Sequence, residues 1–295
     1  MNAGGPSRNH LPDGRWHFQH GPIDLIIGCE GVGTTCARAI EQCWARFETV
    51  LSELVSELPL LRTDCRLLMR AEPPCGAIAQ RMFRACLPYA QHWDLFITPM
   101  AAVAGAVADE LIGALAQPGI DKAYINNGGD IALHLAGSAR FDIGIVTDAH
   151  APAIDAVVPI DHASIVRGVA TSGWRGRSQS LGIADSVTVL AASAAVADAA
   201  ATMIANHVNV SDSSIIRRAA SQLRDDSDLG ELPVTVAVGS LSAQSIASAL
   251  AQGVHFAQSV VQRNLIEHTA LHLAGAWRQV SRATASHPAR VEAVL

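Results

Sequence analysis

The sequence predicts an α+β fold with layers of helices and strands. Segments with the residue pattern of strands come mostly in neighbouring runs, and helical segments are inserted between these runs. Strict alternation of strand and helix, which would indicate a doubly wound parallel sheet, is absent. No segment rich in Gly, Ser or Pro divides the chain. We therefore expect one domain over 15–280, between a flexible leader at 1–14 and a disordered tail at 281–295.

Strands are expected where short apolar or alternating segments end at turn-forming residues. The first two expected strands flank the turn Gly21-Pro22, and the segment 266–275 alternates enough to close a sheet. In chain order, the expected strands cover 16–18, 23–28, 122–126, 131–135, 141–146, 156–160, 164–172, 186–191, 233–239 and 266–275.

Helices are expected where apolar residues recur every three or four positions, as they do at Ile40, Cys43 and Phe47. Pro88 predicts the end of the second helix, and Gly253 predicts a break in the last one. In the third helix, Gly105 allows the backbone of another segment to approach closely. In chain order, the expected helices cover 35–57, 76–87, 99–115, 194–206 and 242–263.

Composition narrows the class of protein. The 295 residues are 49% hydrophobic and 16% charged, which is typical of a globular chain. A net charge of −6 gives no reason to expect nucleic-acid binding, which normally requires a basic face. The six cysteines show no zinc-knuckle spacing, so we expect free thiols in a reducing compartment. With no signal peptide and no run of about 20 apolar residues, the sequence predicts a cytoplasmic protein without a membrane span.

The first candidate site is the sequence NNGGD at 126–130. Gly128 and Gly129 permit positive φ angles and let backbone N–H groups approach a ligand oxygen. Asn126 and Asp130 flank this turn with polar side chains. Taken alone, the same residues are explained more simply as a hairpin turn, because Asn-Gly is a strong hairpin signal.

A second candidate is the turn Thr171-Ser172-Gly173, which is followed by Arg175 and Arg177. Hydroxyl, backbone N–H and guanidinium groups at the end of a strand together suit a phosphate. A polar surface turn with solvated arginines explains the pattern equally well.

The third candidate is the pair Asp198 and Thr202 within an alanine-rich helix. Residues four apart lie on one side of a helix, so a carboxylate and a hydroxyl converge there. Oxygen ligands favour a hard cation such as Mg²⁺, although two side chains cannot complete its coordination. The alternative is that Asp198 interacts with the helix dipole while Thr202 bonds back to its own helix.

The order of these motifs is more specific than any one of them. MAAVAGAVADEL, NNGGDI, VATSG, SVTVLA and ADAAAT follow one another over about residues 95–206. In this order they resemble the ApbE superfamily, the Mg²⁺-dependent FAD:protein FMN transferases. The chain looks most similar to a smaller, uncharacterised ApbE-like branch. The resemblance implies an α+β fold with a duplicated, T-fold-like arrangement of antiparallel sheets and alanine-rich helices.

The resemblance also assigns roles to residues of this sequence. It implies that Asp198, Thr202 and the backbone carbonyl of Ala104 bind Mg²⁺. The catalytic residues are left open, with Asp198 and Asp130 as the candidates. The resemblance implies that the walls of a flavin site, for FAD or FMN, include Asn126, Gly128, Gly129, Asp130, Thr171, Ser172 and Gly173. Arg175 and Arg177 are added as candidate cofactor-binding residues because of their charge.

Two departures from the family pattern bear on the reaction. The transferases carry a lysine where this chain has Ala104, and their H-I-I-D-P segment is absent between ATSG and SVTVLA. Arg175 or Arg177 could supply part of the missing charge. The sequence therefore predicts a Mg²⁺-dependent enzyme acting on a flavin or another nucleotide-like or heteroaromatic ligand, and it leaves transfer of FMN to a protein open.

Two further expectations concern partners. The alternative to an enzyme is a non-catalytic flavin-binding protein that delivers a cofactor to a redox enzyme. The small residues of the helix at 99–115 predict close packing, either on the sheet or on a second copy of the chain in a homo-oligomer.

Overall fold

A computed structural model describes residues 4–145, 156–176, 178–282 and 292–293. The chain forms two compact units. The first comprises Met1–Arg140, Asp161–Val169 and Ala192–Ala199, and the second comprises Phe141–Ile160, Ala170–Ala191 and Ala200–Leu295. The mixture of helices and antiparallel strands confirms the predicted α+β class.

The first unit contains an antiparallel sheet whose strands follow one another in the order β1-β2-β3-β4-β5. The start of β8 pairs with β5, where Ala132 lies opposite Gly168. The strands are β1 (Ser7–His10), β2 (Trp16–His20), β3 (Ile23–Gly31), β4 (Ile120–Asn127), β5 (Asp130–Leu135) and β8 (Gly168–Ser172). Strand β1 lies within the segment expected to be a flexible leader.

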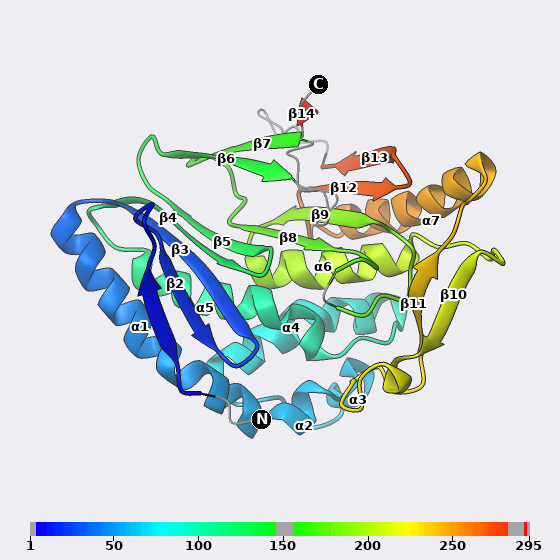
Figure 1. The fold of residues 1–295 in the computed structure, drawn as a ribbon, viewed down its shortest axis with the longest axis horizontal. Coiled ribbons are helices and arrows are strands. Elements are labelled where there is room, and N and C mark those ends of the chain that lie inside the picture. The colour runs from blue at the N-terminus through cyan, green and yellow to red at the C-terminus, as the bar shows by residue number, and fades with distance from the viewer. Residues whose placement is uncertain (1–3, 146–155, 177, 283–291, 294–295) are drawn as a thin grey trace. The chain divides into compact units, whose positions relative to one another are not determined.

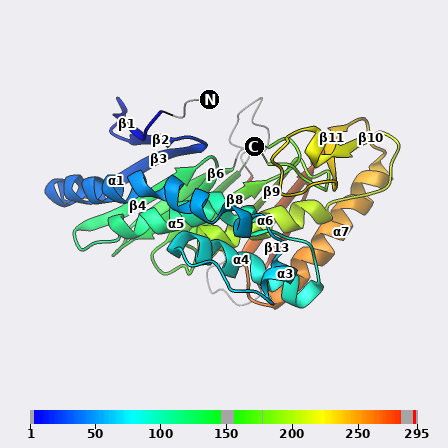
Figure 2. The ribbon, with the colours of Figure 1, turned by 90° about the horizontal axis from the view of Figure 1, so that it is seen from below.

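The helices of the first unit form a layer beside this sheet (Figure 1). They are α1 (Gly33–Ser56), α2 (Leu58–Leu61), α3 (Cys65–Leu68), α4 (Ala77–Trp93), the 3₁₀ helix η1 (Pro99–Ala102), α5 (Val103–Leu115) and the first residues of α6 (Ala194–His207). Helix α1 contacts β2, β3 and α5, and Figure 2 shows it running alongside the strands.

The sequence pattern of β3 explains this layering. Ile23, Leu25 and Ile27 alternate along the strand and are buried, whereas the residues between them are partly exposed. On α1, Cys43 and Phe47 belong to the buried stripe. The buried face of β3, with every second residue apolar, thus packs on the apolar stripe of α1, which recurs about every 3.6 residues.

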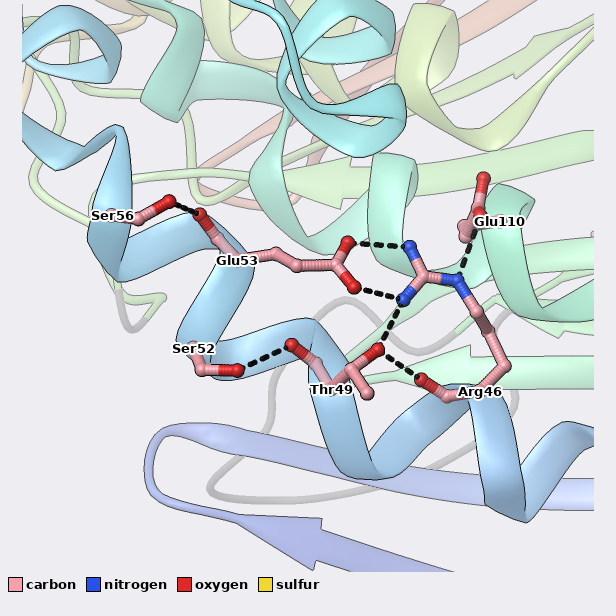
Figure 3. A network of polar contacts seen from close by, with 6 residues as sticks. All are labelled: Arg46, Thr49, Ser52, Glu53, Ser56 and Glu110. Carbon is pink, nitrogen blue, oxygen red and sulfur yellow. Dashed lines mark hydrogen bonds and ion pairs between the residues drawn. The ribbon is translucent and has the colours of Figure 1, made fainter.

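An ion-pair network also joins α1 to α5. The guanidinium of Arg46 donates to both carboxylate oxygens of Glu53 at 2.7 Å, and its Nε donates to Glu110 at 3.0 Å (Figure 3). Arg81 of α4 reaches the second oxygen of Glu110 at 3.2 Å. Glu110 therefore fixes the outer side of α5 against two neighbouring helices.

In the second unit, β9, β12 and β13 are antiparallel neighbours, and α7 packs on β12 and β13. Strands β10 and β11 form a separate pair, and β14, β7 and β6 form a small sheet in that order. Their bounds are β6 (Arg140–Ile145), β7 (Ala156–Asp161), β9 (Ser186–Ala191), β10 (Ile215–Ala219), η2 (Ala220–Gln222), β11 (Pro233–Val238), α7 (Ala243–Gln262), β12 (His268–Leu273), β13 (Ala276–Ser281) and β14 (Glu292–Ala293).

Two predictions about the helices are wrong, one about an end and one about a break. Helix α4 continues through Pro88 to Trp93, because Tyr89 and Ala90 beyond the proline are buried and their packing offsets one missing hydrogen bond. Helix α7 is unbroken at Gly253. This glycine is buried against Val208, whose side chain would lie 2.4 Å from a Cβ at position 253, so packing holds the helix together there.

The predicted strand at 164–172 is also too long. It begins only at Gly168, because Asp161 and Ser164 accept backbone hydrogen bonds that form a polar turn before it. Most of the predicted tail, 283–291 and 294–295, lies outside the described residues, and Ser281 belongs to β13. Among the helices in the described part of the chain, none combines the length and the apolar character needed to cross a membrane.

Candidate functional site

The NNGGD segment forms a two-residue hairpin loop between β4 and β5. Asn127 lies opposite Asp130, and the two glycines between them have φ angles of 67° at Gly128 and 114° at Gly129. The side-chain oxygen of Asn126 accepts a hydrogen bond from the N–H of Gly129 at 2.8 Å. The hairpin interpretation is therefore correct in its geometry, and the loop places two polar side chains, Asn127 and Asp130, opposite each other at its base.

Asn127 faces the interior of the first unit. It follows Ala123 and Ile125 on the buried face of β4 and is only 8% exposed. Its Nδ2 donates to the backbone carbonyl of Ala104 at 3.1 Å. The end of β4 is thus bound to the start of α5. Sequence reasoning missed this residue, although the period-two alternation of β4 places it inward.

Asp198 lies beside the same turn of α5. Its Oδ2 accepts a hydrogen bond from the N–H of Gly105 at 3.0 Å. The approach requires a glycine, because a Cβ at position 105 would lie 2.3 Å from the carbonyl oxygen of Ala194. The close backbone contact expected at Gly105 is therefore present.

The electrostatics of Asp198 distinguish it from a surface carboxylate. Burial raises its pKa well above the ordinary range, and the negative charges of Asp130 and Asp109 raise it further. The N–H groups of Gly105 and Ala104 act in the opposite direction by stabilising the carboxylate. Repulsion between Asp130 and Asp198 is the kind of strain that a bound cation relieves.

Asp109 of α5 makes a second connection to α6. Its two carboxylate oxygens accept hydrogen bonds from the N–H groups of Ala194 at 2.9 Å and Ala195 at 2.8 Å. Burial raises its pKa, and the two N–H groups partly counteract this effect. Sequence reasoning missed Asp109, which lies in an unremarkable position of an apolar helix.

The predicted metal ligands are a carboxylate, a hydroxyl and a carbonyl. Thr202 is partly buried and follows Asp198 by one turn on α6. Ala104 carries the carbonyl that Asn127 contacts. This donor set fits Mg²⁺, which prefers oxygen ligands and keeps several waters or ligand oxygens. Over the described ranges, no three His, Cys, Asp or Glu side chains gather in a metal cluster, so a centre built of such side chains alone is not present there.

The ATSG segment lies at the end of β8, and its contacts fall within the second unit. The hydroxyl of Thr171 is 2.9 Å from that of Thr188 on β9. Gly173 leaves no room for a side chain, because a Cβ there would lie 2.3 Å from the carbonyl oxygen of Asp185. Ser172 is partly exposed beside it. The turn therefore presents hydroxyl groups on a tightly packed backbone.

Arg175 is held in place by Asp185, another residue that sequence reasoning missed. The Nε of Arg175 donates to Asp185 Oδ1 at 3.0 Å, and the Arg175 guanidinium lies 4.6 Å from the ring centroid of Trp174. The other oxygen, Oδ2, accepts from the N–H of Ala274 at 2.6 Å. Arg177, the second predicted arginine, lies outside the described residues.

The family of this chain follows from its match to a protein-family model. The family model described as "AbpE bacteria" matches residues 8–279, which is most of the chain. The chain belongs to this family.

The relatives of this member of the AbpE bacteria family include archaeal proteins whose name is "UPF0280 protein". That of Methanospirillum hungatei is 34% identical over 203 residues, which cover 68% of this chain and 74% of the relative. That of Methanosphaerula palustris is 43% identical over 113 residues, covering 38% of this chain and 47%, or about half, of that relative's length. These relatives confirm the predicted place in an ApbE-like branch without a stated activity.

Two solved ApbE structures are similar to this family member. The apo form of the flavinyl transferase ApbE of Pseudomonas stutzeri aligns over 94% of this chain and 93% of that chain, with a TM-score of 0.43 and 12% identity. The ApbE protein of Thermotoga maritima aligns over 93% and 96%, also with a TM-score of 0.43 and 12% identity.

Proposed function

We propose that the chain is a Mg²⁺-dependent enzyme that acts on a flavin, FAD or FMN, or on another nucleotide-like ligand. The observation that carries this proposal is the hydrogen bond from Gly105 to Asp198, next to the Ala104 carbonyl. It brings a carboxylate from α6 to a backbone carbonyl of α5. The charge of Asp130 beside Asp198 adds a second reason for a cation there.

In this proposal Asp198, Thr202 and the Ala104 carbonyl hold the ion. When bound, Mg²⁺ would neutralise the phosphate charge of the ligand. Asn127 would orient the carbonyl through its Nδ2 hydrogen bond. The N–H groups of Gly105 and Ala104 would hold the Asp198 carboxylate beside the ion. These residues would therefore position charge, and Asp130 would be the candidate acid or base.

We assign contact with the ligand to the two glycine turns. Backbone N–H groups at Gly128 and Gly129 are suited to oxygen atoms, as are the hydroxyls of Thr171 and Ser172. Arg175 uses its Nε for Asp185, so its two Nη groups would be the ones to reach a phosphate. This part of the proposal rests on the chemistry of each turn and on the family relationship.

A second candidate function is a flavin-binding protein that delivers its cofactor to a redox enzyme. It is favoured by Ala104, which stands where the resemblance places the lysine of the transferases. Without that lysine, binding could persist while transfer of FMN to a protein threonine is lost.

Ligand binding is the experiment that tests the proposal. Thermal shift and calorimetry would be run with FAD, FMN, ADP and free heterocycles, with and without Mg²⁺, on the wild type and on Asp198→Ala. The proposal predicts stabilisation that depends on Mg²⁺ in the wild type and disappears in Asp198→Ala. It fails if no ligand gives this behaviour.

A mass measurement separates the two candidate functions. The protein would be incubated with FAD, Mg²⁺ and a threonine-bearing target protein, and the target mass would be recorded. An increase by one FMN would support a transferase. Binding of FAD without any mass increase would favour the cofactor-delivery function.

A further inference from the structure

Helices α5 and α6 cap each other. The N–H groups at the start of a helix have no acceptor within that helix. At the start of α6, the N–H groups of Ala194 and Ala195 find both oxygens of Asp109, which comes from α5. Near the start of α5, the N–H of Gly105 finds Asp198, which comes from α6. Each helix thus supplies the carboxylate that satisfies the beginning of the other.

This reciprocal arrangement leaves little freedom for either helix to slide. The Asp109 contacts fix the first turn of α6, and Asp198 is one helical turn further along. The missing side chain of Gly105 brings the backbones together at Ala194. A shift of α6 would therefore change both the Asp109 contacts and the distance from Asp198 to Gly105.

We propose that Asp109 is a positioning residue, which sets where the Asp198 carboxylate lies relative to the backbone of Ala104 and Gly105. It does so by holding the first turn of α6 and does not touch the ligand itself. The part of this inference that concerns Mg²⁺ rests on the proposed function. The part that concerns Asp198 and Gly105 does not.

Asp109→Asn is the variant of choice, because it keeps the shape of the side chain. Its carboxamide oxygen can accept only one of the two N–H groups, while its NH₂ group faces the other donor. The neighbouring Glu110→Gln is the matched control, since Glu110 contacts Arg46 and Arg81 and makes no contact with α6 among its described hydrogen bonds. Asp109→Ser is a second variant, used if Asp109→Asn does not fold.

Amide hydrogen exchange on the full chain without added metal tests the positioning itself. In Asp109→Asn we expect exchange at Gly105 to accelerate at least tenfold relative to exchange at Leu111, which lies further along the same helix. Glu110→Gln should leave this ratio unchanged. An unchanged ratio in Asp109→Asn, or an equal rise in both variants, overturns the proposal.

Calorimetric titration with Mg²⁺ and ADP tests the consequence for the site. We expect the dissociation constant for Mg²⁺ to rise by roughly 10- to 100-fold in Asp109→Asn, the range found when residues that orient metal ligands are changed. If the wild type binds Mg²⁺ and Asp109→Asn binds it equally well, the role of Asp109 at this site is refuted. If the wild type binds no Mg²⁺ while the Gly105 amide still responds, the proposed function fails and the positioning role stands.

Discussion

The carboxylate of Asp198 and the backbone N–H of Gly105 are joined by a hydrogen bond of 3.0 Å, although 93 positions separate them in the chain. The contact is made possible by a helix that has no side chain where Ala194 approaches.

Gly105→Ala should disrupt the contact. The added methyl group would lie 2.3 Å from the Ala194 carbonyl oxygen, so the backbones must separate. We expect a loss of about 1–3 kcal/mol in the free energy of unfolding, as for other overpacked sites, and weaker Mg²⁺ binding. Urea denaturation and calorimetry would measure both effects.

Gly113→Ala is the matched control on the same helix. Nothing lies within 4 Å of a Cβ at this position, so the substitution should stabilise the helix by roughly 0.5–1 kcal/mol through its higher helix propensity. Equal stability changes in the two variants would contradict the close-approach argument.

The two adjacent asparagines should behave differently. Asn127→Ala removes the hydrogen bond from Nδ2 to the partly buried Ala104 carbonyl, which should cost about 0.5–1.5 kcal/mol of stability and weaken Mg²⁺ binding. Asn126→Ala removes only the hydrogen bond to the Gly129 N–H, so it should cost about 1 kcal/mol with little change in Mg²⁺ affinity. The idea that Asn127 orients the carbonyl is lost if both variants bind Mg²⁺ as the wild type does.

His268 should make stability depend on pH. It is 3% exposed, its Nδ1 contacts the hydroxyl of Ser281 at 2.7 Å, and burial lowers its pKa to about 4. The unfolded chain, with an ordinary histidine pKa near 6.5, binds this proton first. Neutral His268 therefore favours the folded state fully above about pH 6.5. This contribution to the free energy of unfolding, at most about 3 kcal/mol, is lost as the pH falls toward 4.

Denaturation between pH 7 and pH 4 would measure this dependence, and His268→Gln serves as the comparison. The variant should be less stable at pH 7 and should lose less stability on acidification. Parallel curves for the variant and the wild type would show that His268 is not the group responsible.

The cysteines should differ in reactivity toward iodoacetamide, because the thiolate is the reacting form. Burial, with the neighbouring Cys36, raises the pKa of Cys29 to about 12, and burial alone does the same for Cys43. Cys75 is exposed. Mass spectrometry should find Cys75 alkylated well before the other two, and Cys75→Ser should abolish the fast phase. Early labelling of Cys43 would contradict its burial.

The elements with a strong periodic signal were predictable from the sequence. Alternation along β3 and the apolar stripe of α1 place these segments correctly, because burial on one face dictates the residue pattern. The errors at Pro88 and Gly253 arise where tertiary packing outweighs a local preference. Strand β1 was missed because its four residues are polar and mostly exposed, so they carry no such pattern.

The candidate site was predictable only in part. Motif order singled out Asp198, and the small residues of the helix at 99–115 singled out Gly105 as a point of close approach; the structure joins the two residues directly. The alternation of β4 places Asn127 inward, but nothing in the sequence indicates its partner or that of Asp109, since each contacts backbone groups of a segment distant in the sequence. Such contacts depend on which segments pack together in the fold, and a single sequence does not indicate these neighbours.

The central claim, that Asp198 is the carboxylate of a Mg²⁺ site, is tested most directly by calorimetric titration of Mg²⁺ in the presence of ADP on the wild type and on Asp198→Asn. Asparagine keeps an oxygen for the Gly105 N–H and removes the charge. We predict saturable Mg²⁺ binding to the wild type and a dissociation constant at least tenfold higher for the variant, with the fold unchanged by circular dichroism. Equal Mg²⁺ affinity in the two proteins, or no binding to the wild type, would contradict the account.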